Sequence, residues 1–424
     1  MTQHARSYYA ASTNLDLRYP ALEQDLDVDV CIVGAGITGA SAALSLAEKG
    51  YKVVVLEANQ VGWGASGRSG GQMIFGYACE QETLTRLMGP RASQTLWQTS
   101  LAAMNLMRMR IEKHHIHCDL VDGHLHAAMK PRHMTELAGW KRSLEKEFGY
   151  GSLQLWDQAR LRQQLASDAY LGGLFDPNSG HVHPLNYTLG LVQAAEQAGA
   201  TFYEHSAVTR IEQGTTPLAH TERGQVRCRH LLLCGNAYLS GVAPDIERKL
   251  MPVGTYITAT APLGAERAQD LIRNNMAVAD INFVLDYFRL SADHRLLFGG
   301  RVSYSGREPR HLASLMGQRL RHIFPQLYDV EQQYTWGGYV GITMNRAPHF
   351  GRLNGNVYFA QGFSGHGIAL TGMAGSLMAE TIAGSAERFD LFCKIPHHDF
   401  PGGRLLRTPA LVLAMTWYRL RDWL

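Results

Sequence analysis

Three glycines and one carboxylate near the start of the chain have the spacing of a nucleotide-binding turn. Residues 29–58 read DVCIVGAGITGASAALSLAEKGYKVVVLEA, with Gly34, Gly36 and Gly39 in the pattern GxGxxG. The first glycine permits a tight bend, the second lets backbone N–H groups approach a pyrophosphate, and the third lets a helix pack closely on a strand. Glu57 lies where a carboxylate can accept hydrogen bonds from a ribose 2′-OH. The pattern predicts a dinucleotide site and disfavours NADP, because Glu57 would repel a 2′-phosphate.

A strand, a helix and a second strand must hold these residues in place. The sequence predicts a strand over 30–33, a helix over about 38–49 that ends before Gly50, and a strand over 52–56. The N-terminus of that helix would supply partial positive charge for the phosphates. A turn without a ligand would not need the strands, the helix and the acid together, so we favour the dinucleotide.

Composition sets the class of protein. A chain of 424 residues with 46% hydrophobic and 18% charged residues is long enough for two or three units with a large core. The formal net charge of +3 is too small to indicate nucleic-acid binding. Six cysteines without a CxxC pair indicate reduced thiols. With no apolar signal segment at the N-terminus and no apolar run of about 18 residues, we expect a cytoplasmic protein without a spanning helix.

A second glycine-rich stretch distinguishes between dinucleotides. Residues 61–73, VGWGASGRSGGQM, contain five glycines around Ser66 and Ser69. Their exposed backbone suits a second close approach to a cofactor, which an NAD site does not need. The alternative is a flexible surface loop, but the interleaved Trp63, Arg68 and Gln72 indicate an ordered one.

A third glycine-rich turn lies far along the chain. The sequence predicts a strand over 357–360, the loop GFSGHG over 362–367, and a helix of small residues that stops at Gly384. In a flavoprotein, the N-terminus of such a helix would face the N1–C2=O edge of the isoalloxazine, which becomes negative on reduction. Alternatively, these glycines only shape the turn. Strands predicted over 206–211 and 228–234, the second running into Gly235 and Asn236, would return the chain to the same sheet.

These motifs together resemble the D-amino-acid oxidase and glycine oxidase superfamily of FAD-dependent amine oxidoreductases, over nearly the whole chain. Within it, the resemblance is strongest to the amine oxidases of bacterial polyamine catabolism. The motifs that carry the closer match are SYYAAS (7–12), GASGRSGGQ (64–72), SGHVHPLN (179–186), GNAYL (235–239), LDYFRLSADHRLLFGG (285–300), GFSGHG (362–367), AERFDLF (386–392) and FPGGRLLR (400–407).

The resemblance implies an α/β protein of two domains. A Rossmann-like FAD-binding domain would be assembled from residues 1–88, 184–242 and 340–424. A smaller substrate domain with a mainly antiparallel sheet would come from residues 89–183 and 243–339. The sequence agrees in outline, because 252–260 and 281–302 are rich in β-forming residues and 92–116 and 132–147 have helical patterns.

The resemblance also implies which residues contact the cofactor. Those expected at the ADP half are Gly34, Gly36, Thr38, Gly39, Glu57 and Ala58, with the backbone of Val208 at the adenine. Those expected at the pyrophosphate, ribityl chain or flavin are Ala65, Ser66, Ser69, Gly70, Gly71, Gln72, Gly235 and Asn236. Those expected at the pyrimidine edge are Gly365, His366, Gly367 and Ile368. The FAD should be non-covalent, since residues 335–351 contain no cysteine, whereas some relatives link flavin to a cysteine just upstream of the segment matched here.

The implied reaction is oxidation of gamma-glutamylputrescine, or a related gamma-glutamyl-polyamine, at its free amine. The products would be an aldehyde, ammonia and hydrogen peroxide. His366 and Tyr287 are the candidate catalytic residues, and Trp63 and Tyr287 are the candidate substrate-binding residues. Ordinary core packing is expected for most other aromatic residues near these loops: Phe75, Tyr77, Phe288, Trp336 and Tyr339. His181 and His183 are expected to pack and cap a helix rather than bind metal, and no metal is expected.

The substrate class also depends on what one segment lacks. Amino-acid oxidases of this fold commonly grip the substrate carboxylate with an arginine near the segment matched by residues 337–343, which here has no arginine. That argues against an α-amino acid oxidised at Cα, although Arg346 could bind a more distant carboxylate. Two other functions stay open: a dehydrogenase that passes electrons to a quinone or protein, and a non-catalytic flavin-binding protein. The amphipathic segment 411–424 could dock on its own domain, on a partner or on a membrane surface.

Overall fold

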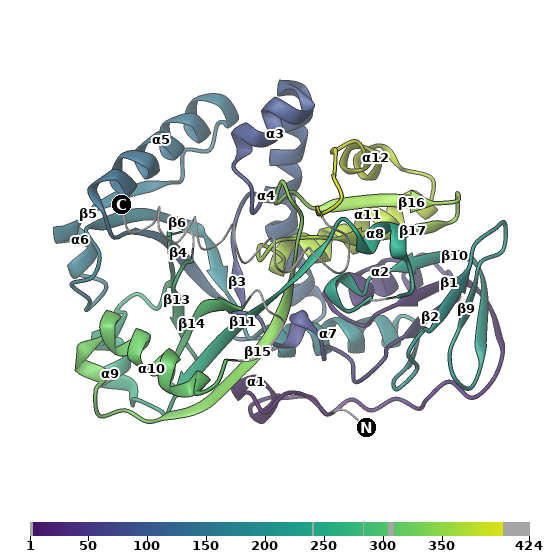
Figure 1. Ribbon diagram of the computed structural model, residues 1–424, viewed down its shortest axis with the longest axis horizontal. Helices are drawn as coiled ribbons and strands as arrows, with labels where there is room; N and C mark the ends of the chain where they lie inside the picture. Colours follow the sequence, from purple (N-terminus) through teal and green to yellow (C-terminus); the bar gives the residue numbers. More distant parts are fainter. Residues whose placement is uncertain (1–2, 240, 283, 304–308, 402–424) are drawn as a thin grey trace.

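The computed structural model describes residues 3–239, 241–282, 284–303 and 309–401, which are arranged around two β-sheets (Figure 1). The amphipathic segment 411–424 lies outside these described residues, as does most of the FPGGRLLR motif. No helix among the described residues combines the length and the apolar character needed to cross a bilayer.

The first sheet has the parallel core that the opening motif predicts. Its strand order is β16-β17-β10-β1-β2-β7, and all neighbours in this path are parallel except the β16–β17 pair. The strands are β1 (Leu26–Val33), β2 (Val53–Leu56), β7 (Thr201–Tyr203), β10 (Gln225–Leu233), β16 (His349–Leu353) and β17 (Val357–Gln361). The four residues of β2 are apolar and buried, as expected for a parallel strand that is covered on both faces.

Helices cover one face of this sheet and a hairpin lies on the other. The helices are α2 (Ile37–Ala47), α4 (Pro90–Lys113), α7 (Pro184–Gln197) and α11 (Ile368–Ile382), with α12 (Glu387–Cys393) beside β16. The hairpin strands are β8 (Arg210–Glu212) and β9 (Leu218–His220), and β9 pairs with β10. Small residues let α2 and α11 approach closely: a Cβ added to Gly375 would lie 2.3 Å from the carbonyl oxygen of Thr38.

The second sheet is mainly antiparallel, as predicted for the substrate domain. Its order is β15-β11-β14-β13-β12-β4-β6-β3, with β5 paired to β6, and β12 and β4 are its parallel pair. The strands are β3 (Gln72–Met73), β4 (Val121–Ala128), β5 (Gln154–Asp157), β6 (Gly172–His181), β11 (Met251–Thr260), β12 (Ala277–Asp280), β13 (Tyr287–Leu290), β14 (Leu296–Ser303) and β15 (Gln332–Ile342).

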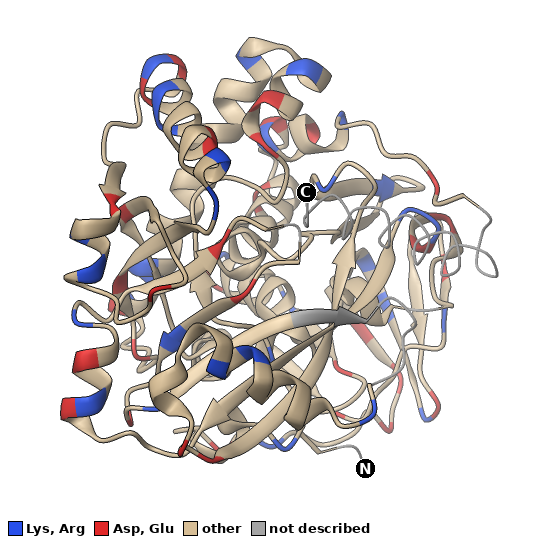
Figure 2. Cartoon of the chain, turned by 60° about the vertical axis from the view of Figure 1, so that its left-hand side comes forward, with Lys and Arg blue, Asp and Glu red and all other residues tan. Residues whose placement is uncertain are grey.

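The remaining helices lie around the second sheet and between the two sheets. They are α1 (Tyr8–Ala11), α3 (Gln81–Met88), α5 (Pro131–Phe148), α6 (Gln158–Arg162), α8 (Pro244–Glu247), α9 (Ala265–Leu271) and α10 (Leu312–Ile323). Short 3₁₀ turns are η1 (Ala65–Gly67), η2 (Asn236–Tyr238) and η3 (Pro325–Leu327). Lys and Arg are interspersed with Asp and Glu over these elements rather than gathered in one block (Figure 2).

Most predicted elements are present, with one correction. Helices predicted over 92–116 and 132–147 are α4 and α5, and the strand predicted over 252–260 is β11. The strand predicted over 206–211 is wrong in its bounds, since β8 begins only at Arg210. Residues before it are held by single contacts instead, such as the bond from the Ser206 amide to the Glu57 carbonyl (2.8 Å). The exact division of the chain into domains stays a prediction.

Candidate functional site

Four glycine-rich segments, far apart in sequence, meet at one edge of the parallel sheet. The last residue of β1, Val33, pairs with Leu56 of β2 and with Leu233 of β10, and Leu233 pairs with Phe359 of β17. Parallel strands in register end at the same edge. The segments that follow them therefore lie side by side, at the carboxyl edge where open α/β sheets bind their ligands.

The opening turn has the close contacts that its glycines predict. Gly34 has φ +101°, and a Cβ there would lie 3.1 Å from the carbonyl carbon of Cys234. A Cβ on Gly39 would lie 1.9 Å from the carbonyl oxygen of Gly34, so only glycine allows this helix–strand contact. A Cβ on Gly36 would lie 2.7 Å from Oγ of Ser66, which already accepts the amide of Ile37 at 3.0 Å. The two predicted cofactor loops are therefore in direct contact.

Glu57 sits beside the opening turn and shapes it. One carboxylate oxygen accepts the amide of Ala35 at 2.8 Å and the other accepts the amide of Asn59 at 2.9 Å. Burial raises the pKa of this carboxyl. Each oxygen keeps a further lone pair, so contact with a ribose hydroxyl remains compatible with these bonds. Val208 lies two residues after Ser206, whose amide bonds to the Glu57 carbonyl. Its role at the adenine stays a prediction.

The loop that contains Ser66, Ser69 and Gly70 presents an unpaired oxygen. Oγ of Ser69 is buried and has no hydrogen-bond partner among the described residues. Gly70 lies against the ring of Tyr287, because a Cβ there would come within 2.6 Å of Cε2 of Tyr287. Gly71 has φ +73°, and its carbonyl accepts the amide of Val182 at 2.8 Å. The loop is therefore ordered, which contradicts the alternative of a flexible surface loop.

Arg289 of β13 holds this loop from the side of the second sheet. It is 3% exposed. Its guanidinium donates to the carbonyl oxygens of Gly70 (2.9 Å), Val182 (2.8 Å) and Leu290 (3.1 Å), and to the hydroxyl of Tyr9 (3.1 Å). Sequence reasoning did not single out Arg289, although it lies in the motif LDYFRL and Tyr9 lies in SYYAAS. Through Arg289, these two motifs lie next to each other and next to the loop that contains Gly70.

His366 links the third glycine-rich loop to the second. Its Nε2 lies 2.8 Å from the carbonyl oxygen of Phe75 and 3.2 Å from that of Ile74, so Nε2 carries the proton and donates. Burial lowers the pKa of His366, which keeps the ring neutral. Gly365 has φ +91°, and no side chain caps the N-terminus of α11, whose N-cap is Gly367. The first amides of α11 are therefore left available to a ligand.

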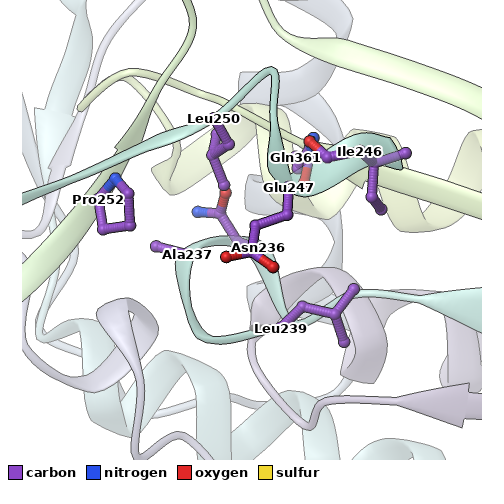
Figure 3. Close-up of a pocket in the computed structure, with 8 residues that line it drawn as sticks. All are labelled: Asn236, Ala237, Leu239, Ile246, Glu247, Leu250, Pro252 and Gln361. Carbon is purple, nitrogen blue, oxygen red and sulfur yellow. The ribbon is translucent and has the colours of Figure 1, made fainter. Parts of the chain in front are cut away.

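Asn236 joins the ends of two strands of the parallel sheet. Asn236 has φ +46°, and its Oδ1 accepts a hydrogen bond from the amide of Gly362 at 3.0 Å. A small cavity of about 40 Å³ lies beside it, lined by Asn236, Ala237, Leu239, Ile246, Glu247, Leu250, Pro252 and Gln361 (Figure 3). This cavity has room for little more than water. The role of Asn236 seen here is to fix the turn after β10 against the turn after β17.

The arrangement matches a known family. The sequence model described as DAO, FAD dependent oxidoreductase, matches residues 29–381. The chain belongs to this family. It is 42% identical to gamma-glutamylputrescine oxidoreductase of Escherichia coli, covering 100% of this chain and 99% of that protein. It is also 42% identical to the probable oxidoreductase OrdL of Haemophilus influenzae, covering 99% and 98%.

The fold of this FAD-dependent oxidoreductase is that of glycine oxidase. The crystal structure of glycine oxidase from Geobacillus kaustophilus superimposes with a TM-score of 0.74 at 21% identity, covering 88% of this chain and 99% of that one. This likeness confirms the α/β fold with its two sheets, and the match to the FAD dependent oxidoreductase model confirms FAD as the cofactor.

The residues present fit FAD. The ADP half would lie over Gly34, Gly36 and the N-terminus of α2, whose N-cap is Gly36, so that no Cβ of these residues blocks a pyrophosphate. The orphaned hydroxyl of Ser69 would gain a partner from the cofactor. The flavin end would face the N-terminus of α11. The role of each predicted contact residue stays a prediction.

The two candidate substrate residues lie in different surroundings. Tyr287 packs between Gly70 and Gly299 on the sheet face that looks toward the FAD loops. Trp63 donates its indole N–H to the carbonyl of Gln3 (3.0 Å), and the guanidinium carbon of Arg68 lies 4.0 Å from its ring centroid. A cation already occupies one face of Trp63, so its role in holding an amine is the weaker of the two predictions.

The histidines of HVHP have structural partners. His183 is the N-cap of α7: its Nδ1 accepts the amide of Asn186 at 3.1 Å, as expected for a capping residue. Its Nε2 lies 3.1 Å from Oγ of Ser12. His181 donates through Nε2 to the carbonyl of Asn275 at 2.8 Å. In the part of the chain that the structure describes, no group of three or more His, Cys, Asp or Glu is placed to hold a metal ion.

Proposed function

We propose that this FAD-dependent oxidoreductase oxidises gamma-glutamylputrescine, or a related gamma-glutamyl-polyamine, at the free amine. The observation that carries the proposal is the 42% identity, along the whole chain, to the relative named for that substrate. The overall reaction would convert R–CH2–NH2, O2 and H2O to R–CHO, NH3 and H2O2. FAD supplies the acceptor for the hydride that leaves the carbon bearing the amine.

The protein's own residues would orient the amine and exclude water. Tyr287 and Gly70 form one side of the reacting site, and the loop of His366 forms another. Positioning of this kind can supply much of the rate of such a reaction, since a bound amine close to its acceptor reacts as if intramolecular. No strong acid or base is required once the amine is neutral.

The chain around β15 suits a substrate whose carboxylate lies far from its reacting amine. Residues 337–342 of β15 carry no cationic side chain. Arg346 follows that strand, and its positive charge adds to burial in lowering the pKa of His366. Burial raises the pKa of the Cys79 thiol to about 12, and the same charge of Arg346 opposes that rise. The amide of Arg346 donates to the carbonyl of Thr343 (3.1 Å), and the amide of Thr343 donates to Oγ of Ser364 in the loop GFSGHG (3.3 Å). We propose that the side chain of Arg346 binds the distal carboxylate of the substrate.

Anaerobic bleaching of the flavin tests this function. Gamma-glutamylputrescine should bleach the purified enzyme, and peroxide should appear when air is admitted. Glycine, sarcosine and D-alanine should be poor substrates, and efficient turnover of these three with none on gamma-glutamylputrescine would overturn the proposal. Arg346→Met should raise KM for gamma-glutamylputrescine and leave KM for putrescine, which lacks the carboxylate, nearly unchanged.

A second candidate differs only in the electron acceptor. A dehydrogenase of the same fold would be bleached by the amine but would pass electrons to a quinone or a protein. Steady peroxide production with amine and air alone, at the rate of flavin reduction, would exclude that as the main activity. A protein whose flavin no amine bleaches would instead be a non-catalytic flavin-binding protein.

A further inference from the structure

One row of paired residues crosses the second sheet on the face that packs against Gly70 of the glycine-rich loop 61–73. His126 of β4 pairs with Ala279 of β12, Ala279 pairs with Tyr287 of β13, and Tyr287 pairs with Gly299 of β14. Directly paired residues on neighbouring strands project to the same face. His126 therefore stands two strands from Tyr287, roughly 10 Å away by the usual strand spacing. Only the methyl group of Ala279 lies between them in that row.

Three aromatic rings surround the side chain of His126. The ring centroids lie 5.8 Å away for Phe75, 5.9 Å for Trp140 and 4.7 Å for His124, each close to edge-on. Phe75 follows β3, and its carbonyl oxygen accepts the bond from His366. Trp140 belongs to α5, which packs over this end of the sheet. The rings of Phe75, Trp140 and His124 form a box around His126, and the bond from His366 to Phe75 attaches this box to the loop at the N-terminus of α11.

His126 differs from two neighbouring histidines in that, within the described part of the chain, both of its ring nitrogens lack a protein partner, whereas His124 and His181 each leave only Nδ1 without one. His124 bonds through Nε2 to Oε1 of Gln72 at 3.3 Å. His366 and His181 each donate to a backbone carbonyl. Among the described residues, neither ring nitrogen of the half-buried His126 has a hydrogen-bond partner. One of them can accept a hydrogen bond from a ligand.

We propose that His126 accepts a hydrogen bond from the reacting amine of the substrate, in a box walled by Phe75 and Trp140. This inference rests on the proposed amine oxidation and adds the residue that binds the amine. The aromatic walls favour a cation or a polarised N–H group over an anion. A carboxylate at this position would meet one imidazole N–H of His126 but no positive charge on that ring, whereas an amine can donate to the other ring nitrogen.

The charge state of the box suits the reactive form of the amine. Burial lowers the pKa of His126 to about 4, with a further contribution from His366, so the ring is neutral near pH 7 and does not repel an ammonium group. No carboxylate contributes to that shift. A desolvated box without an anion lowers the pKa of an amine inside it. The neutral amine, whose lone pair assists loss of the hydride, is therefore favoured.

Two variants separate acceptance of a hydrogen bond from ring packing. His126→Phe keeps an aromatic ring and removes the acceptor, whereas His126→Gln keeps an acceptor. Binding of n-butylamine is titrated through the perturbation of the flavin absorbance under anaerobic conditions, per bound FAD. We expect the Kd for n-butylamine to rise about tenfold or more in His126→Phe. In His126→Gln, the Kd should return most of the way to that of the unmodified protein. His322→Phe, an exposed histidine on α10, is the matched control and should bind as the unmodified protein does.

A dead-end ligand distinguishes this inference from the proposed function. Gamma-glutamyl-n-butylamide lacks the terminal amine, so it should bind the unmodified protein and His126→Phe equally. Equal n-butylamine affinity in His126→Phe and the unmodified protein would overturn the role of His126, whatever the substrate is. Absence of flavin bleaching by gamma-glutamylputrescine in the unmodified protein would instead overturn the proposed function. It would not affect a measured difference in amine binding between the variants.

Discussion

The Nε2 atom of His366 lies 2.8 Å from the carbonyl oxygen of Phe75, and this bond decides what His366 can do. Because Nε2 holds the proton and donates it to Phe75, the neutral ring keeps only Nδ1, which accepts. Donors toward a reduced flavin would therefore come from the backbone at the start of α11, while His366 fixes the position of that loop and of the Phe75 wall.

His366→Ala should lower the rate of flavin reduction by the substrate more than it lowers thermal stability. Loss of one donor of an anion-stabilising site typically costs about 10²-fold or more in rate, and His366→Ala should approach that loss because it releases the loop that holds the backbone donors. Stopped-flow reduction and a melting curve measure the two effects. Near-normal reduction and reoxidation rates would mean that His366 is only a packing residue. His366→Gln, which can donate to Phe75, should recover part of the rate.

Gly36→Val should empty the cofactor site. A Cβ at this position already comes within 2.7 Å of Oγ of Ser66, and the branched side chain would enter the path of the pyrophosphate. The ratio of flavin absorbance at about 450 nm to protein absorbance at about 280 nm reports the fraction of the protein that holds FAD. Gly139→Val in α5, where an added Cβ meets nothing within 4 Å, is the control and should stay yellow. Full occupancy in Gly36→Val would show that the pyrophosphate is placed wrongly.

The FAD should be released by acid precipitation. Residues 335–351 contain no cysteine, and the nearby Cys393 and Cys79 have pKa values raised by burial, to about 11 and about 12, so neither is an activated thiol. All of the yellow colour should appear in the supernatant. A yellow pellet that resists washing would contradict a non-covalent cofactor.

Arg289→Met should weaken FAD binding through the loop that contains Gly70. The change leaves the carbonyl oxygens of Gly70 and Val182 without their donor, and each unsatisfied buried group costs about 1–3 kcal/mol. Fluorescence of released FAD during dilution measures the loss, which should be about tenfold or more in Kd. Tyr9→Phe removes one of the four partners and should have a smaller effect in the same direction. Unchanged FAD retention in both variants would leave Arg289 without a positioning role.

Acid should destabilise the fold partly through His181. Burial, and then the charge of Arg289, lowers the pKa of this histidine to about 3. An unfolded histidine titrates near 6.5, so between pH 6.5 and about 3 the unfolded chain binds a proton that the folded chain does not. The free energy of unfolding therefore rises with pH in this window, and the share of stability that depends on the neutral His181 is lost as the pH falls. The melting temperature should fall as the pH is lowered from about 6.5 to about 4.5, which lies inside that window. The melting temperature of His181→Asn should depend less steeply on pH. Parallel slopes for the two proteins would contradict this assignment.

The sequence by itself determined the local turns. Gly34, Gly36 and Gly39 predict a tight turn because the backbone conformation and the absence of a Cβ are properties of single residues. The structure has that turn, with φ +101° at Gly34. Similarly, Pro184 and His183 predict the start and cap of α7, because capping depends on residues that are three positions apart. The mainly antiparallel second sheet was predicted through a family resemblance rather than through periodicity.

Only the tertiary structure decided which distant residues meet. Val33 and Leu233 become neighbours through the order and register of strands in the sheet, and a period of two along each strand does not encode that register. The same is true of Arg289 with Gly70, and of the row from His126 to Tyr287. The strand predicted over 206–211 was wrong in its bounds, because the amide of Ser206 bonds to the carbonyl of Glu57 and ladder pairing begins only at Arg210. Local sequence therefore sets the backbone of each loop, whereas the pairing of strands sets which side chains share the site.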